Sequence, residues 1–245
     1  MTEFIVNYKI NKRNTIEELS DDFAQLIIDE LNKKQGFISV ALSGGSTPKK
    51  LFVHLAENYK LKINWKRIKF FWGDERCVPP DDPESNYKLA KDFLFSKVDI
   101  PEENIFRVYG ESIPEEEAVR YSEIIREILP IKNNLPVFNI VLHGLGEDGH
   151  TASIFPDRLD LINSRNICDI AEHPITKQKR ITLTGSVINN SKNIVFLVTG
   201  TSKSKIVDII IKKKEGSDKL PASFIHPVNG SLIWYLDNDA AKILK

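Results

Sequence analysis

The chain has 245 residues, of which 41% are hydrophobic, and its 34 basic and 34 acidic residues give a net charge of zero. This length and composition suffice for one full hydrophobic core, and we expect a single domain over residues 1–245. A balanced charge lacks the basic excess typical of nucleic-acid-binding proteins, so we expect no nucleic-acid partner.

The cysteines and the apolar segments indicate the cellular setting. Cys77 and Cys168 fit neither a metal-ligand spacing nor a disulfide framework, which favours a reducing compartment. The first residues hold only a short apolar run, unlike a signal peptide. No segment approaches the roughly 18 apolar residues of a membrane helix. We therefore expect a soluble cytoplasmic protein with no membrane partner.

Helices and short apolar strands alternate from the start of the chain. Apolar residues at helical spacing predict a helix over residues 15–34, and Thr15 with Glu18 fits a capping box at its start. Residues 37–43 read as a buried strand. A glycine-rich turn then leads into a helix over residues 49–59.

The same alternation continues to the C-terminus. Strands are predicted over residues 68–73, 138–144, 193–200 and 231–237, and helices over residues 86–98, 115–129, 202–214 and 238–245. Wholly apolar short strands between amphipathic helices are typical of a mostly parallel sheet covered by helices on both faces. The sequence therefore predicts a Rossmann-like α/β fold, with ligands bound where the strands end.

The first of these strand ends is the loop "SGGSTPKK". The loop begins at Ser43, a candidate binding residue, and its Gly44 and Gly45 let the backbone approach a ligand closely. Ser46 and Thr47 then lead directly into a helix N-terminus. Free N–H groups and the positive end of the helix dipole favour an anion such as phosphate there. The lysine-containing end of a Walker A loop is absent, and an ordinary turn would also use glycines.

The second strand end carries the charged triplet Asp74, Glu75 and Arg76, followed by a proline-rich segment. A solvated loop with a local ion pair would look similar. Because parallel strands end at a ligand-binding cleft, we favour a functional role.

The third strand end, "HGLGEDGHTASIFP", contains the G-x-G-x-x-G pattern of dinucleotide-binding loops. Two features oppose that function. Glu147 and Asp148 would face the pyrophosphate, and each like-charge pair would cost on the order of 3 kcal/mol before screening. Pro156 also leaves no room for the full helix that such a fold needs. We expect the glycines to provide backbone clearance instead.

Histidine and cationic residues complete the candidate site. His150, expected at or near a helix start beside Asp148, is a candidate general base, although it could serve only as a cap. Arg180 and Lys203 lie near predicted strands and could converge on a phosphate dianion.

Taken together and in this order, these loops resemble the 6-phosphogluconolactonase family. The resemblance spans nearly the whole chain and rests on "ALSGGSTPKKLF", "FFWGDERCVPPDDPESNY", "GLGEDGHTASIFP", "RITLT", "VTGTSK" and "LPASFIHPVNGSLIWYLDNDAA". It implies hydrolysis of 6-phospho-D-glucono-1,5-lactone, a small-molecule sugar-phosphate substrate, without a cofactor or metal. We also expect a monomer.

The resemblance also implies roles for individual residues. His150 resembles the base that activates water, and Arg76 resembles a substrate-binding arginine. The phosphate-holding residues would be Gly44, Gly45 and Thr47, with Arg180 and Lys203 as cationic partners. Asp74 and Asp148 occupy motif positions in the cleft, with less defined roles.

One position departs from the family pattern. His143 stands where the family usually has an aliphatic residue, and we expect a hydrogen-bonded histidine at a strand end.

Three other functions stay open at this point. Glucosamine-6-phosphate deaminases share the fold, but they tend to have D-E-Y in the second loop and a further glutamate after the histidine. Residues 151–156 contain no glutamate. A non-catalytic sugar-phosphate sensor and a dinucleotide oxidoreductase are the remaining alternatives. A sugar-phosphate sensor would usually carry a DNA-binding segment, and the sequence shows none.

Overall fold

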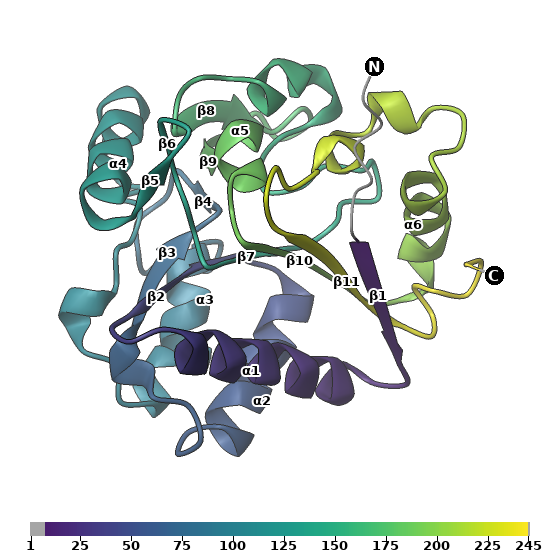
Figure 1. The fold of residues 1–245 in the computed structure, drawn as a ribbon. Coiled ribbons are helices and arrows are strands. Elements are labelled where there is room, and N and C mark those ends of the chain that lie inside the picture. Colours follow the sequence, from purple (N-terminus) through teal and green to yellow (C-terminus); the bar gives the residue numbers. More distant parts are fainter. Residues whose placement is uncertain (1–7, 245) are drawn as a thin grey trace.

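The computed structural model describes residues 8–244, and its main sheet consists of six parallel strands (Figure 1). Their order across the sheet is β1–β11–β10–β7–β2–β3. Their bounds are β1 Tyr8–Arg13, β2 Ile38–Leu42, β3 Ile68–Trp72, β7 Ile140–His143, β10 Asn193–Val198 and β11 Ser231–Asp237. The prediction of a mostly parallel sheet is confirmed. The edge strand β1 was not predicted, because its residues are largely polar and exposed.

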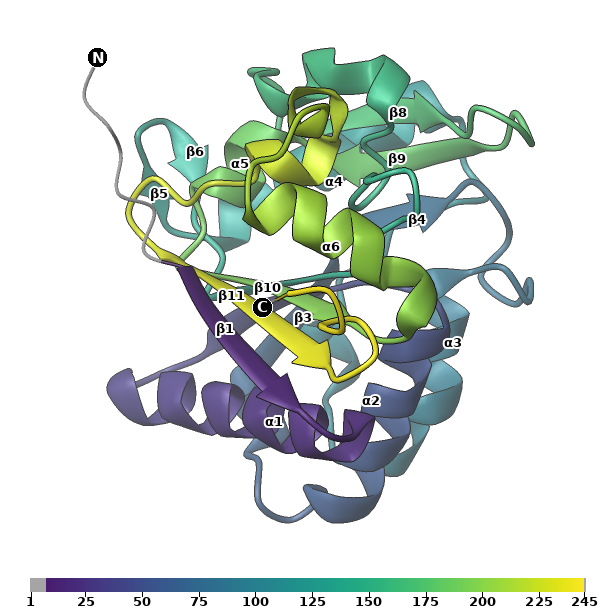
Figure 2. The same ribbon diagram turned by 90° about the vertical axis from the view of Figure 1, so that its right-hand side faces the viewer.

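Helices cover both faces of this sheet, as predicted (Figures 1 and 2). On one face lie α1 Ile16–Lys33, α2 Ser46–Asn58 and α3 Asn86–Phe93. On the other lie α4 Pro114–Ile128, α5 Gly185–Asn189 and α6 Ser204–Ile211. The predicted capping box of α1 is present: Thr15 accepts from the Glu18 N–H, and the Glu18 carboxylate accepts from the Thr15 N–H.

A second, antiparallel sheet escaped the sequence analysis. It contains β4 Asp74–Arg76, β8 Cys168–Glu172 and β9 Lys179–Leu183, in the order β4–β9–β8. The short, charged sequence of β4 reads as a loop, which is why no strand was predicted there. A small hairpin, β5 Ile131–Lys132 with β6 Leu135–Pro136, was also not predicted, because its strands are too short to show a pattern.

The chain passes from the main sheet into the second sheet at Gly73. Its N–H donates to the carbonyl of Leu42 in the main sheet, and its carbonyl accepts from Leu183 in the second, both at 2.8 Å. This passage from one sheet to the other places β4, and with it Asp74 and Arg76, at the carboxyl edge of the main sheet. Two strand systems therefore meet where ligands bind in this class of fold.

Short 3₁₀ helices occupy several connections. They are η1 Trp65–Arg67, η2 Phe95–Lys97, η3 Glu102–Asn104, η4 Pro156–Ile162, η5 Thr201–Lys203, η6 Ser217–Lys219 and η7 Pro221–Phe224. Two predicted helices are divided by such segments. The helix expected over 86–98 breaks at Leu94, and the one expected over 202–214 begins as η5 and ends at Ile211.

The predicted C-terminal helix over residues 238–245 is wrong. Turns follow β11, and the Asp237 carboxylate accepts a hydrogen bond from the Ala240 N–H at 2.7 Å. That contact resembles a helix cap, but the backbone bonds from Lys242 to Asp239 and from Leu244 to Ala241 close single turns, and no helix follows β11 within residues 8–244. Residue 245 lies outside the described residues.

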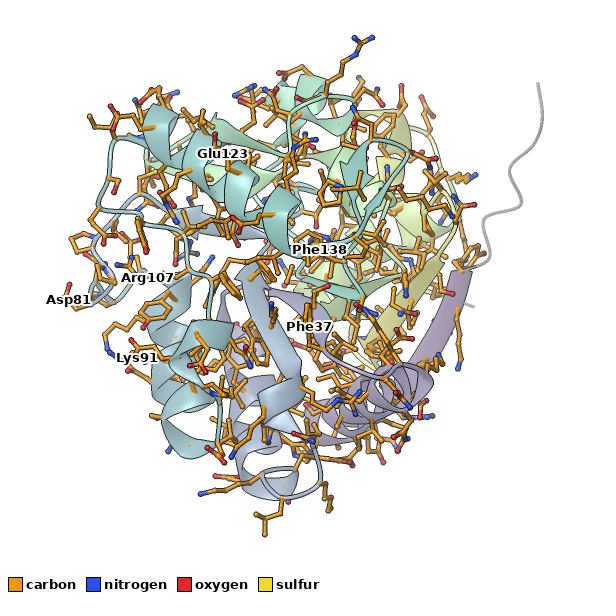
Figure 3. All side chains as sticks on the ribbon, turned by 60° about the vertical axis from the view of Figure 1, so that its left-hand side comes forward. Phe37, Asp81, Lys91, Arg107, Glu123 and Phe138 are labelled. Carbon is orange, nitrogen blue, oxygen red and sulfur yellow. The ribbon has the colours of Figure 1, made fainter. Side chains whose placement is uncertain are left out.

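The core on the α4 side of the sheet is aromatic. Phe138, labelled in Figure 3, is fully buried and contacts Phe71 edge-on, with ring centroids 5.4 Å apart. Tyr121 of α4 reaches the end of β3, where its hydroxyl accepts from the Trp72 N–H at 2.7 Å. These contacts fix α4 against the strand that leads into the second sheet.

His143, the last residue of β7, is buried to 1% exposure and lies beside Phe196, with ring centroids 5.5 Å apart. Within residues 8–244, neither ring nitrogen has a hydrogen-bond partner. The expectation of a hydrogen-bonded histidine is therefore wrong. Packing between neighbouring strands surrounds the imidazole, and it lowers the pKa of His143 to about 4.

This burial predicts a loss of stability in acid. The unfolded chain binds a proton on this imidazole near pH 6.5, whereas the folded protein does not do so until about pH 4. The free energy of unfolding should therefore fall as the pH drops through this window, by about 3 kcal/mol in total. Denaturant unfolding at pH 7 and at pH 4.5 should show a clearly smaller difference for His143→Leu than for the wild type. Equal differences would contradict a neutral buried histidine.

Candidate functional site

The first wall of the site is the loop between β2 and α2. Gly45 precedes the helix with φ +106°, a left-handed conformation that favours glycine, and α2 has no side-chain cap. The N–H groups in the first turn of an α-helix have no intrahelical acceptor, and here no side chain takes that place. These groups form the positive end of the helix dipole. The Thr47 hydroxyl lies 2.9 Å from the Thr199 hydroxyl, which ties this loop to the end of β10.

The second wall is β4. Asp74 is only 6% exposed, and its Oδ2 accepts a hydrogen bond from the Ser153 hydroxyl at 2.6 Å. The same oxygen lies 4.0 Å from Nη1 of Arg180 on the adjacent strand β9. Asp74 is thus a fixed negative charge between the second sheet and the loop after β7.

Two arginines face each other across the second sheet. Arg76 and Arg180 are register partners in the antiparallel pair of β4 and β9, so their side chains lie on the same face. Both Nε atoms are buried, and within residues 8–244 neither has a hydrogen-bond partner. Burial lowers the pKa of Arg180, and the charge of Arg76 lowers it further. Two half-buried guanidinium groups, each with an Nε donor that no protein group uses in this range, are suited to a bound anion.

The third wall is the loop after β7. His150 Nδ1 lies 2.6 Å from Asp148 Oδ1, and a carboxylate can only accept, so Nδ1 carries the proton. The other ring nitrogen, Nε2, is left as the acceptor. Burial alone would raise the pKa of Asp148, but the hydrogen bond and charge of His150 outweigh it, and the pKa lies below its usual value. This is the geometry of a histidine base oriented by an acid.

His150 does not lie at a helix start, contrary to expectation; it lies in the loop that follows the turn at residues 147–148, and η4 begins only at Pro156. The predicted clearance role of the glycines holds at Gly146. A Cβ at this position would lie 2.1 Å from His150 Nδ1 and 2.4 Å from Asp148 Oδ1. The glycine therefore makes room for the histidine–aspartate pair.

The fourth wall begins where β10 ends. Lys203 closes η5, and its Nζ lies 3.9 Å from the Glu147 carboxylate across the cleft. Asp237 of β11 holds the preceding turn, because its carboxylate accepts from the Gly200 N–H at 3.0 Å.

These walls enclose a cleft of about 270 Å³. Of the predicted site residues, those that line it are Ser43, Gly44, Gly45, Thr47, Asp74, Arg76, His150, Arg180 and Lys203. Asp148 does not line the cleft and contacts it through His150. Within residues 8–244, no three His, Cys, Asp or Glu side chains are arranged to hold a metal ion. No helix in the same range is long and apolar enough to cross a membrane.

Three further residues take part in the site without having been assigned a role. Ser153 holds Asp74, Thr199 holds Thr47, and Asn86 lines the cleft between the first two walls. Each lies inside or beside a stretch that carries the family resemblance. Their partners are distant in the sequence, so no local pattern shows what they contact.

Comparison with known proteins gives a consistent result. Residues 11–234 match the model of the family described as glucosamine-6-phosphate isomerases/6-phosphogluconolactonase. The 6-phosphogluconolactonase of Haemophilus influenzae is 40% identical over 233 residues, covering 95% of this chain and 96% of its own. That of Treponema pallidum is 40% identical over 200 residues, covering 82% and 83%. The solved 6-phosphogluconolactonase of Trypanosoma brucei superposes with a TM-score of 0.87 at 30% identity, covering 98% of this chain and 100% of that one.

The unused arginine donors predict that the cleft binds inorganic phosphate. Arg180→Gln should weaken this binding by at least about 10-fold, because it removes a charged donor and leaves Asp74 without its nearby cation. Isothermal titration calorimetry at low ionic strength measures the effect. The matched control is Arg165→Gln at an exposed position, which should bind like the wild type. Equal binding by both variants would show that phosphate does not use the cleft.

Proposed function

Because the chain belongs to the glucosamine-6-phosphate isomerase/6-phosphogluconolactonase family, we propose that it hydrolyses 6-phospho-D-glucono-1,5-lactone to 6-phospho-D-gluconate. This reaction is the second step of the oxidative pentose phosphate pathway. The 6-phosphogluconolactonases that match almost the whole chain support the lactonase branch of the family. One structural observation carries the proposal: an acid-oriented histidine and two arginines, whose Nε donors have no partner within residues 8–244, face one cleft.

The phosphate end of the substrate fits the first and fourth walls. Ser43, Gly44, Gly45 and Thr47 surround the N-terminus of α2, whose free N–H groups are suited to phosphate oxygens. Arg180 and Lys203 supply positive charge from two other elements. In the proposal Lys203 leaves its loose contact with Glu147 and binds the phosphate.

The lactone end then lies beside His150. Its unprotonated Nε2 takes a proton from water, and the water oxygen forms a bond to C1 of the lactone. Asp148 keeps the ring in the correct tautomer and stabilises the imidazolium that forms. Arg76 faces the developing negative charge on the carbonyl oxygen.

The ring then opens. The bond between C1 and the ring oxygen breaks, and the imidazolium returns its proton to that oxygen, which becomes the hydroxyl of the open-chain acid. Asp74 takes part by holding Arg180 and Ser153 at the cleft wall and by keeping a fixed negative charge beside the arginines. The chain needs no cofactor in this scheme, because a lactone is already an activated ester.

A cytoplasmic monomer is part of the proposal. Cys77 and Cys168 are both free thiols, which fits a reducing compartment. All four walls of the cleft come from one chain, so a partner subunit is not needed to complete the site.

His150→Asn should lower the enzymatic rate by roughly 100-fold or more, which is the usual contribution of a positioned base. The substrate is generated in situ from glucose 6-phosphate, and the spontaneous rate is subtracted. His54→Asn is the matched control, because His54 of α2 pairs with Asp21 of α1 and does not line the cleft. A wild-type rate no faster than buffer would refute the lactonase proposal. Ammonia release from glucosamine 6-phosphate would then be the next assay.

The pH profile tests the base separately. Asp148 stays ionised well into acid because His150 lowers its pKa. The acid limb of the wild-type rate should therefore come from the proposed base, His150, and not from Asp148, and the rate should fall towards acid pH. The residual rate of His150→Asn should be flat over the same range. A flat wild-type profile would contradict a histidine base.

A further inference from the structure

Two buried polar side chains connect the first and second walls of the cleft, and the proposed reaction gives neither of them a role. Glu75 and Asn86 are each only 2% exposed. They lie at opposite ends of the irregular segment between β4 and α3, which contains Pro79, Pro80 and Pro83.

Glu75 joins the two ends of that segment. Its Oε1 accepts from the backbone N–H groups of Arg76 at 2.8 Å and Asn86 at 2.7 Å. Its Oε2 accepts from the Tyr87 N–H at 2.7 Å and from the Ser85 hydroxyl at 3.2 Å. Four donors thus meet one carboxylate, and they tie the start of α3 directly to β4.

Asn86 extends this link to the phosphate side. Its Nδ2 donates to the carbonyl of Asp74 at 2.9 Å, which fixes the amide orientation and turns Oδ1 toward Gly44. A Cβ on Gly44 would lie 1.7 Å from that oxygen and 2.4 Å from Cγ. The glycine loop therefore lies directly against the amide.

Helix capping does not explain this arrangement. The N-cap of α3 is Ser85, whose hydroxyl accepts from the Lys88 N–H at 3.1 Å. The side chain of Asn86 points instead between Asp74 and Gly44, along the wall of the cleft.

We propose that Glu75 and Asn86 are positioning residues that set the separation between the phosphate-binding loop at Gly44 and the Asp74–Arg76 edge. The substrate and its reacting carbon belong to the proposed function, on which this inference rests. The phosphate and the carbonyl carbon lie at opposite ends of the proposed lactone substrate. The distance between the two walls that contact these ends must therefore stay fixed. A displacement of about 1 Å at such a site can cost on the order of 100-fold in rate.

A double-mutant cycle between Gly44→Ala and Asn86→Ala tests the contact. Gly44→Ala alone should weaken inorganic phosphate binding by about 100-fold, because its methyl group has no room beside the amide. Asn86→Ala alone should weaken it by about 10-fold. The alanine removes Oδ1, Cγ and Nδ2, which are the atoms that crowd a residue 44 side chain. The double variant should therefore bind within about 3-fold of Asn86→Ala.

Additive losses in the double variant would overturn the proposal, because they would show that the loop does not rest on the amide. Thermal unfolding of each variant establishes that it is folded at the temperature of the binding measurement. Asn104→Ala is the control for loss of an asparagine side chain. Asn104 Nδ2 donates to the backbone carbonyl of Lys66 on the exposed surface, away from the cleft. This variant should bind phosphate like the wild type.

Glu75→Gln provides an independent test that does not depend on Asn86→Ala folding. The glutamine keeps the shape but turns an amide N–H toward backbone N–H groups that need an acceptor. We expect KM to rise and kcat to fall, each by about 10-fold, because both walls move. Wild-type values for both constants would overturn the role of Glu75.

These experiments separate the inference from the proposed function. Phosphate binding is measured without the lactone. If the losses of phosphate binding in the double-mutant cycle are not additive, but the protein does not hydrolyse the lactone, the proposed reaction is refuted and the positioning role of Glu75 and Asn86 stands. If the protein hydrolyses the lactone but the losses of phosphate binding in the double-mutant cycle are additive, only the positioning role is refuted.

Discussion

The structure depends on the opposition of Arg76 and Arg180 across a short antiparallel strand pair. Two guanidinium groups share one face of β4 and β9, and the carboxylate beside them, Asp74, supplies less charge than they carry. Like charges repel, and burial strengthens the repulsion, so a bound anion stabilises this half-buried pair. In the proposed complex, the phosphate of the substrate lies at Arg180 and its C1 oxygens lie at Arg76. The second sheet, the switch at Gly73 and the hydrogen bond from Ser153 all act to hold this charged surface at the carboxyl edge of the main sheet.

The end of the cleft at which we propose the proton transfer is built differently. A hydrogen bond joins His150 to Asp148, and Gly146 leaves space for this pair. In the proposal, the arginine wall holds the substrate and faces the histidine–aspartate pair that transfers the proton. Lactone hydrolysis requires little beyond this division, since positioning and charge stabilisation supply most of the barrier reduction for an activated ester.

The main sheet, its helices and most cleft residues could be predicted from the sequence, because periodicity and strand-end loops are local signals. The second sheet could not, since β4 is short and charged and β9 pairs with it across a long stretch of chain. The contacts Ser153–Asp74 and Asn86–Gly44 are equally long-range. The C-terminal helix was wrong because the backbone after Asp237 closes successive single turns. The expected partner of His143 was wrong because tight packing surrounds it.

The most direct test is a crystal structure of the protein with 6-phospho-D-gluconate bound. We expect the phosphate at the N-terminus of α2, within hydrogen-bond distance of Arg180 and Lys203. The C1 carboxylate should lie beside Arg76 and His150 Nε2. The reverse orientation, with the phosphate at His150, or a ligand bound outside the cleft, would contradict the division of the site into an anion-binding wall and a proton-transfer pair.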